Sequence, residues 1–200
     1  MTPPVELVAD VLREVKVPVR VMIRDNTDDL DLLEAQIQSF INLPLDGIIF
    51  GTLDANNHLD FAGMDRVLHH MPQSWGWTLH RAFDWAAGTV EEKLAAVKAH
   101  GRADHVLTGD AWHLEPPPGI AFIAGGGLSF ENLPQYLASP CREFHFGRDA
   151  RTPQETTAPV DAERVRKLAD LLHEKNTSQL LTWRIKSAYS DLAPSNVHST

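Results

Sequence analysis

Short apolar runs alternate with longer amphipathic stretches along most of this chain. Runs of strand length, rich in β-branched and aromatic residues, lie at 19–23, 47–50, 75–80, 105–107, 120–123 and 143–146. Apolar residues at helical spacing fill most of the intervals between them, and a last well-patterned helix is predicted at 160–173. Strands that alternate with helices predict repeated βα units, which build a parallel sheet with right-handed crossovers.

Helix ends are marked by local signals. Asp28 can cap the helix that follows the first strand, and Thr89 with Glu92 forms a capping box before another. Gly101 stands where the left-handed end of that helix is expected. These signals predict where two of the crossover helices begin and where one of them ends.

Two connections depart from the regular βα pattern. The segment 108–119 has too few residues and too many prolines for a crossover helix. The segment 129–139 is a weak helix, in which Pro134 is tolerable only in the first turns. We expect one domain over 1–174 and a flexible, poorly patterned tail over 175–200.

Two architectures fit six consecutive βα units. A doubly wound open sheet usually carries its glycine-rich turn after the first strand, whereas here the triple glycine follows the fifth. A (β/α)₈ barrel places its phosphate site after strands seven and eight. The glycines fit that place if the visible strands are numbers three to eight. The sequence therefore predicts an α/β fold of TIM-barrel type that is incomplete, with about six βα units and the first two strands absent.

Composition narrows the classes of function. Against 18 Lys and Arg stand 27 Asp and Glu, and the net charge of −9 disfavours binding to nucleic acid. No apolar run reaches the roughly 18–20 residues of a membrane span, so we expect no membrane partner. The N-terminal residues lack the pattern of a signal peptide, and we expect a cytoplasmic protein.

The densest polar cluster follows the third strand run. His80, Arg81 and Asp84 lie at its carboxyl end, where the side chains of a barrel converge on one mouth. Histidine exchanges protons near neutral pH, arginine holds a carboxylate or phosphate, and aspartate orients either of them. The alternative is a salt-bridged strand end without any reaction, and the residues alone leave both interpretations open.

Four further residues suggest an anion site at the same mouth. Arg24 follows the first strand run and could join His80 and Arg81, or pair with a surface aspartate. Gly125, Gly126 and Gly127 run from a strand towards the next helix, where backbone amides can approach an anion closely. A small anionic molecule is therefore the expected partner.

Metal binding has weaker support in the residues. His80, His105 and His145 belong to three strand runs, but His105 opens its strand whereas His80 closes its own. These two histidines would lie at opposite ends of a barrel, which disfavours a three-histidine site. Cys141, the single cysteine, cannot form a thiolate cluster by itself and is expected to pack in the core.

Six ordered motifs and a following helix resemble the CutC copper-homeostasis family. The resemblance implies a TIM-type barrel in the cytoplasm that often self-associates. Copper as a bound metal is implied by this resemblance alone. It also puts Arg24, His80, Arg81, Asp84 and the three glycines on family-typical positions. The segments are VPVRVMIR (17–24), DGIIFGTLDANNHLD (46–60), TLHRAFD (78–84), VLTGD (106–110), IAGGGLSFENL (123–133), EFHFGR (143–148) and VDAERVRKL (160–168).

The chain also departs from the family pattern. The first two strands, with the cysteines usually linked to copper, have no counterpart here, so a thiolate copper site does not transfer to this chain. A proline-rich loop at 116–118 replaces the sixth crossover helix, and Gly147 and Arg148 stand where a small hydroxyl residue and alanine are usual. These departures are typical of a truncated or divergent member.

Three hypotheses follow for the function. The first is a cytoplasmic copper-homeostasis protein of the CutC family that binds copper ions. The second is a barrel enzyme that binds a small anionic or phosphorylated metabolite, with His80 and Asp84 in proton transfer. The third is a remnant with neither function. Six strands of an eight-stranded barrel leave two open edges, so we also expect a homo-oligomer.

Overall fold

The computed structural model describes residues 2–25 and 29–173. It divides into two compact units, each described here by itself. The first unit comprises residues up to 128 together with 132–145, and it contains the whole sheet. The second comprises 129–131 and the chain from 146 onwards. The predicted tail at 175–200, like Asp28, lies outside the described residues.

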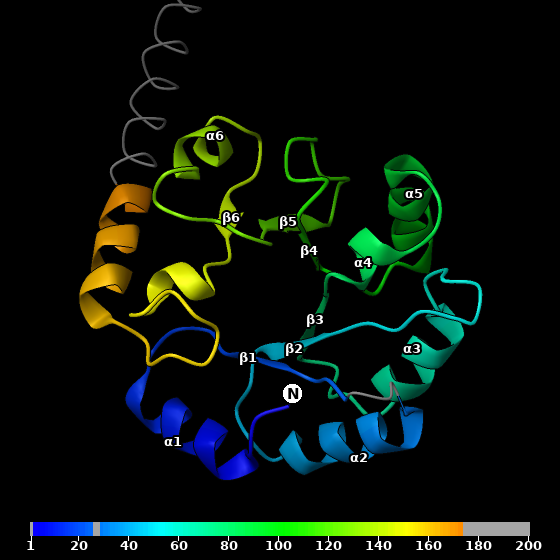
Figure 1. Ribbon diagram of the computed structural model, residues 1–200. Helices are drawn as coiled ribbons and strands as arrows, with labels where there is room; N and C mark the ends of the chain where they lie inside the picture. The colour runs from blue at the N-terminus through cyan, green and yellow to red at the C-terminus, as the bar shows by residue number, and fades with distance from the viewer. Residues whose placement is uncertain (1, 26–28, 174–200) are drawn as a thin grey trace, which may run out of the picture. The chain divides into compact units, whose positions relative to one another are not determined.

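One parallel sheet forms the centre of the first unit. Its strands pair in the order of the sequence, and every pairing is parallel. Figure 1 shows the strands following one another along a curved sheet. In the described residues there are six strands, two fewer than in a complete (β/α)₈ barrel, so the predicted incomplete TIM-type fold is confirmed. They are β1 (Arg20–Met22), β2 (Gly47–Phe50), β3 (Gly76–Leu79), β4 (His105–Thr108), β5 (Ala121–Ala124) and β6 (Glu143–Phe144).

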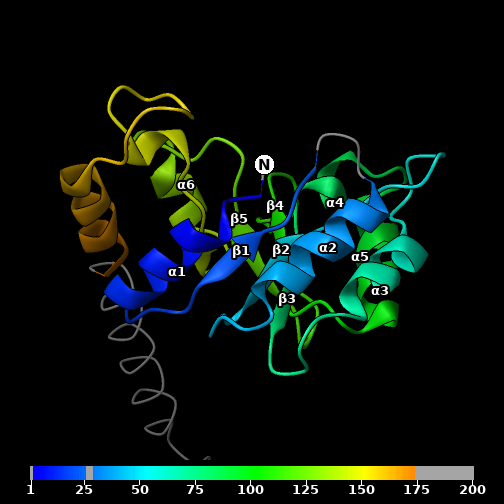
Figure 2. The same cartoon turned by 90° about the horizontal axis from the view of Figure 1, so that it is seen from below.

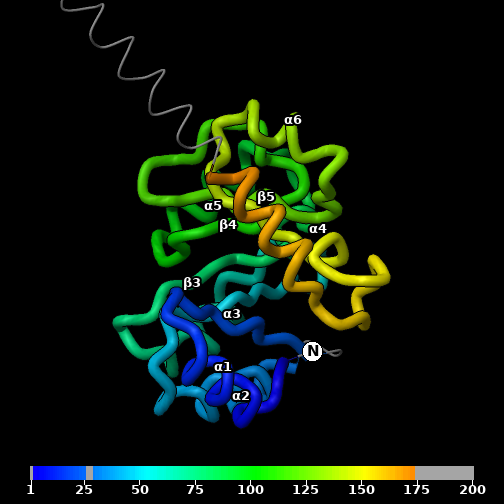
Figure 3. The backbone as a smooth tube through the Cα atoms, turned by 90° about the vertical axis from the view of Figure 1, so that its left-hand side faces the viewer, coloured from blue at the N-terminus to red at the C-terminus, as the bar shows by residue number. Residues whose placement is uncertain are grey.

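Helices follow most of the strands and cover one side of the sheet. Figure 2 shows α1 and α2 on the side of β1 and β2, and α2 packs against α3. The tube in Figure 3 follows the chain from α1 and α2 at one end to α5 and α6. The helices are α1 (Val5–Glu14), α2 (Leu30–Phe40), α3 (Phe61–Leu68), α4 (Ala82–Trp85), α5 (Val90–His100) and α6 (Leu133–Leu137).

The core lies between the sheet and these helices. Trp77 and Leu79 of β3 are fully buried, as are Ile48 of β2 and Val106 of β4. The indole N–H of Trp77 donates to the carbonyl oxygen of Phe50 at 3.0 Å, which satisfies a buried donor. Burial of this layer fixes the register of the strands, because a slip by one residue would turn it to the opposite face.

The structure corrects some predicted helix boundaries. The N-cap of α2 is Asp29, whose side chain accepts from the amides of Asp31 and Leu32. The helix predicted over 129–139 is the five-residue α6, with Pro134 in its first turn. The short α4 was not predicted, because four residues are too few to show helical periodicity.

The second unit is organised around one buried carboxylate. Asp149 belongs to a 3₁₀ turn (Arg148–Ala150), and its side chain is 4% exposed. Its Oδ1 lies 2.9 Å from Nη2 of Arg164, and its Oδ2 accepts from the amide of Phe130 at 3.0 Å. Arg164 belongs to the helix over 162–173, so the ion pair holds this helix against the turn.

The capping box that the sequence predicted for α5 provides a test of the fold. Thr89 accepts from the amide of Glu92 at 3.2 Å, and Glu92 accepts from the amide of Thr89 at 2.8 Å. The substitution Thr89→Ala should lower the free energy of unfolding by about 1 kcal/mol, because it leaves a helix amide without its acceptor. Thr89→Ser keeps the hydroxyl and should match the wild type in urea denaturation. An equal loss of unfolding free energy in Thr89→Ala and Thr89→Ser would show that the hydroxyl of Thr89 does not stabilise the helix.

Candidate functional site

A buried carboxylate organises the carboxyl ends of β3 and β4. The side chain of Asp84, in α4, is only 2% exposed. Its Oδ1 accepts from the hydroxyl of Thr108 at 2.6 Å, and its Oδ2 accepts from the amide of Gly109 at 2.9 Å. Both partners belong to the end of β4, so the carboxylate fastens α4 to this strand end.

The same carboxylate holds Arg81. Nε of Arg81 donates to Oδ2 of Asp84 at 2.7 Å, and the arginine side chain remains 37% exposed. A β-carbon placed on Gly126 would lie 3.0 Å from Cζ and from Nη1 of Arg81, and one on Gly109 would lie 3.3 Å from Nη2. The guanidinium group therefore lies against the ends of β4 and β5, with its Nη groups beside Gly109 and Gly126.

The triple-glycine turn begins directly after β5. Gly125 is buried, and a β-carbon there would lie 2.5 Å from Cδ1 of Leu107, so a larger residue does not fit. Gly126 and Gly127 are exposed, and their backbone φ angles of +96° and +117° are values that residues other than glycine rarely adopt. The predicted helix N-terminus does not add to this turn, because α6 begins only at Leu133 and has five residues.

His80 is directed to a different strand end. Its Nδ1 accepts from the amide of Ala82 at 3.1 Å, so in the neutral ring the proton is on Nε2. A β-carbon on Gly51, just after β2, would lie 3.0 Å from the same Nδ1. In the enzyme hypothesis drawn from the sequence, Asp84 orients His80. In the described contacts Asp84 accepts from Arg81, Thr108 and Gly109 instead, and the Ala82 amide positions His80.

Arg24 is the predicted site residue with the weakest connection to the others. It follows β1, where its backbone exchanges hydrogen bonds with Thr2. Arg24 is exposed. Among residues 2–25 and 29–173, no described contact joins its side chain to Arg81 or to the glycine turn. The structure thus brings together Arg81, Asp84 and Gly126 but shows no such association for Arg24.

The opposite ends of the strands carry a second polar cluster. Arg20 at the start of β1 donates to Thr78 at 2.8 Å and to both carboxylate oxygens of Asp104, at 2.7 and 2.5 Å. His105 at the start of β4 has Nδ1 3.0 Å from Asp104 Oδ1, without the alignment of a hydrogen bond, and Nε2 3.3 Å from Oε1 of Glu143. His105 and His80 therefore belong to opposite strand ends, as the sequence predicted.

This cluster raises the pKa of His105 and lowers the pKa of Asp104. The carboxylate of Asp104, and then that of Glu143, raises the pKa of His105 to about 9. Burial by itself would raise the pKa of Asp104, but the cationic groups of His105 and Arg20 outweigh it and hold this pKa well below its usual range. The cluster is accordingly a set of ion pairs at neutral pH.

Cys141 is a core residue, as expected from the sequence. It is 2% exposed, and its thiol donates to the carbonyl oxygens of Phe122 at 3.1 Å and Glu143 at 3.2 Å. Burial raises the pKa of this thiol, which disfavours the thiolate that a soft metal needs. Across the described part of the chain, no three His, Cys, Asp or Glu side chains gather in a way that could hold a metal ion.

Sequence reasoning missed three residues near Arg81. Thr108 and Gly109 are ordinary strand-end residues, and only the spatial neighbourhood of β3 and β4 shows that they bind Asp84. Trp85 is 58% exposed, with its ring centroid 5.7 Å from Cζ of Arg81. A tryptophan four residues after an arginine is a signal that could have suggested a cation–π pair, once a helix over 82–85 was expected.

The raised pKa of His105 makes stability depend on pH. Protonated His105 stabilises the folded state fully below its ordinary pKa of 6.5, and this contribution is lost as the pH rises through about 9. Solvent screens the accessible part of the pair, so the expected loss is on the order of 1 kcal/mol. Urea denaturation at pH 6.5 and pH 9.5 measures it.

Two variants make this measurement specific. His105→Gln should remove most of the fall in unfolding free energy between the two pH values. His113→Gln, which changes an exposed histidine of the loop after β4, should keep the wild-type fall. An identical pH dependence in the wild type and in His105→Gln would contradict the assignment.

Comparison with known proteins agrees with the fold and the motif order. The sequence model of the CutC family matches residues 1–112. A CutC family protein of Xanthomonas axonopodis pv. citri (strain 306) is 26% identical, over 87% of this chain and 85% of its own length. One of Xylella fastidiosa (strain 9a5c) is 24% identical, over 87% of this chain and 77% of its own length.

A solved structure shows the same fold. It is a crystal structure from Streptococcus agalactiae, described as a candidate copper homeostasis protein CutC. It superposes with a TM-score of 0.61 at 22% identity, covering 72% of this chain and 81% of that one. Among the described residues, no helix has the length and apolar character needed to cross a membrane.

Proposed function

Because the chain belongs to the CutC family, as the match over residues 1–112 shows, we propose that it takes part in copper homeostasis. The observation that supports this role is the family match. The relatives carry the same family name, and the solved neighbour is described as a candidate copper homeostasis protein. A cytoplasmic location and self-association belong to the same proposal, because the family resemblance implies both.

The described residues do not fit a thiolate copper site. Cu(I) prefers sulfur ligands, and a cluster needs more than one of them. The thiol of Cys141 is buried and donates to two backbone carbonyls, and no other cysteine exists in the sequence. The proposed role in copper homeostasis therefore does not depend on tight Cu(I) binding by the described residues.

Copper titration tests this conclusion. We expect no stoichiometric, chelator-resistant Cu(I) on the full chain, because one buried thiol cannot outcompete a strong chelator. The measurement is copper content after dialysis against a Cu(I) chelator, for the wild type and for Cys141→Ala. Retention of one copper per chain in both proteins would contradict this conclusion and reveal a site without the cysteine.

The geometry favours a second function, binding of a small anion at the carboxyl ends of β3 to β5. The single observation that supports it is the position of Arg81, which Asp84 holds with its Nη groups beside Gly109 and Gly126. Arginine binds carboxylate or phosphate through paired N–H groups, and an exposed glycine turn gives an anion access to backbone amides. Anionic or phosphorylated metabolites are the matching class.

A proton-transfer step would depend on His80. The Ala82 amide donates to Nδ1, so in the neutral ring the proton is on Nε2, and Nε2 is the atom proposed to exchange a proton with a substrate. Asp84 is then a positioning residue for Arg81 rather than a partner of His80. We therefore keep His80 and Arg81 as the catalytic pair of the enzyme alternative, with Asp84 behind the arginine.

Calorimetry with inorganic phosphate tests the anion site. Arg81→Met should weaken phosphate binding several-fold or more, because it removes the charge-assisted hydrogen bonds, each worth about 1.5–3 kcal/mol before desolvation. Asp84→Asn should weaken it less, since the guanidinium stays but loses its charged anchor. His80→Ala should leave phosphate affinity unchanged.

Two surface controls accompany these variants. Arg13→Met removes an exposed cation of α1 and should bind phosphate like the wild type. Arg24→Met tests the remaining predicted residue and should also have little effect. Equal affinity of the wild type and Arg81→Met, or a large loss in Arg13→Met, would show that phosphate binds elsewhere or only by net charge.

A further inference from the structure

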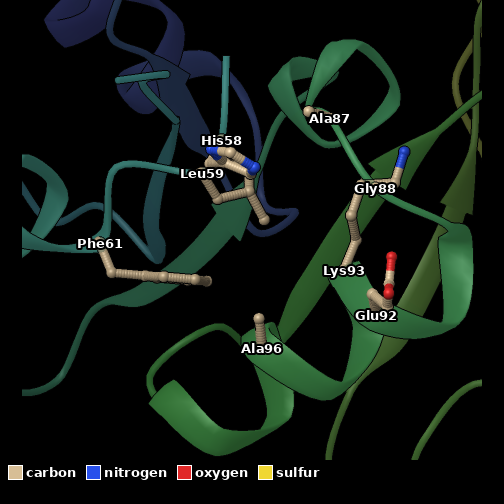
Figure 4. Close-up of a pocket in the computed structure, with 8 residues that line it drawn as sticks. All are labelled: His58, Leu59, Phe61, Ala87, Gly88, Glu92, Lys93 and Ala96. Carbon is tan, nitrogen blue, oxygen red and sulfur yellow. The ribbon is translucent and has the colours of Figure 1, made fainter. Parts of the chain in front are cut away.

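A groove outside the Arg81 site lies between the start of α3, with the loop before it, and the first half of α5. Its volume is about 420 Å³, and one side consists of His58, Leu59 and Phe61. Figure 4 shows this side facing α5 across the groove, with Ala96 on the α5 side. The amide of Ala87 donates to the carbonyl oxygen of Asn57 at 2.7 Å, which holds the two loops together at the groove.

The α5 side of the groove contains a buried cation. Lys93 is 7% exposed, although lysine is almost never buried without a charged partner. Its Nζ lies 4.9 Å from the ring centroid of Phe83, which stabilises the ammonium through a cation–π contact. Across residues 2–25 and 29–173, no carboxylate forms an ion pair with it.

The neighbouring acid does not neutralise this cation. Glu92 also lines the groove, but its carboxylate accepts from the amide of Thr89 in the capping box. In Figure 4 the Lys93 side chain runs along the groove and its amine ends beside Gly88. A buried ammonium that lines an accessible groove and lacks a carboxylate is suited to receive the carboxylate of a ligand.

We propose that this groove binds a small apolar carboxylate, with Lys93 as its charged anchor. The carboxylate would meet Nζ at the Gly88 end, and the apolar body would pack against Leu59, Phe61 and Ala96. One cation matches one negative charge, and the nearby Glu92 repels ligands of higher charge such as phosphate. The groove thus differs in specificity from the Arg81 site.

Calorimetric titration with benzoate and benzamide tests the proposal. Benzoate should bind saturably, and benzamide, which has the same ring but no charge, should bind at least ten-fold more weakly. Saturating inorganic phosphate should leave benzoate affinity unchanged, which separates this groove from the Arg81 site. No saturable benzoate binding, equal affinity for both compounds, or competition by phosphate would overturn the proposal.

Matched variants on α5 locate the binding. Lys93→Met keeps the aliphatic stem and should lower benzoate affinity at least ten-fold, whereas Lys98→Met, at an exposed position, should leave it unchanged. Ala96→Phe should fill the groove and abolish binding, whereas Ala95→Phe on the exposed side should not. Wild-type affinity in both Lys93→Met and Ala96→Phe would overturn the assignment, and the benzoate and benzamide comparison on the wild type decides it if a variant does not fold.

Discussion

The buried carboxylate of Asp84 is the interaction on which the site at the carboxyl strand ends depends. It is 2% exposed, and its oxygens accept hydrogen bonds from three donors, Arg81, Thr108 and Gly109. Two of these fasten α4 to the end of β4, and the third aligns a guanidinium with the turn after β5. Without this carboxylate, the arginine would lose both its orientation and the charge that compensates its own.

The sequence allowed the sheet to be predicted well and the side-chain partners less well. Periodicity and capping signals such as Thr89 and Gly101 act locally, so the strands and α5 could be located from the chain alone. Two of the three partners of Asp84, Thr108 and Gly109, are 24 and 25 positions away along the chain, and only the parallel register of β3 and β4 brings them close. The expected pairing of Asp84 with His80 and the expected role of Arg24 came from closeness in sequence and from strand-end position, and neither signal determines which side chains meet.

Family membership and the chemistry of the described residues support two different proposals, a role in copper homeostasis and the binding of anions. The family match shows a CutC-family chain and supports the proposed role in copper homeostasis, whereas the described residues offer a buried thiol and no cluster of metal ligands. What they do offer is cationic: Arg81 beside an exposed glycine turn, and Lys93 in a groove on the helical side. Both features have the charge and accessibility that suit an organic or inorganic anion.

The most direct test of the central claim is an amide NMR titration of the full chain with inorganic phosphate. If Asp84 holds Arg81 as the anchor of an anion site, the largest shifts should occur at Gly109, Gly126 and Gly127 and at Nε–H of Arg81. They should saturate together with one dissociation constant. Shifts that fail to saturate, or that concentrate on residues remote from these strand ends, would contradict the account.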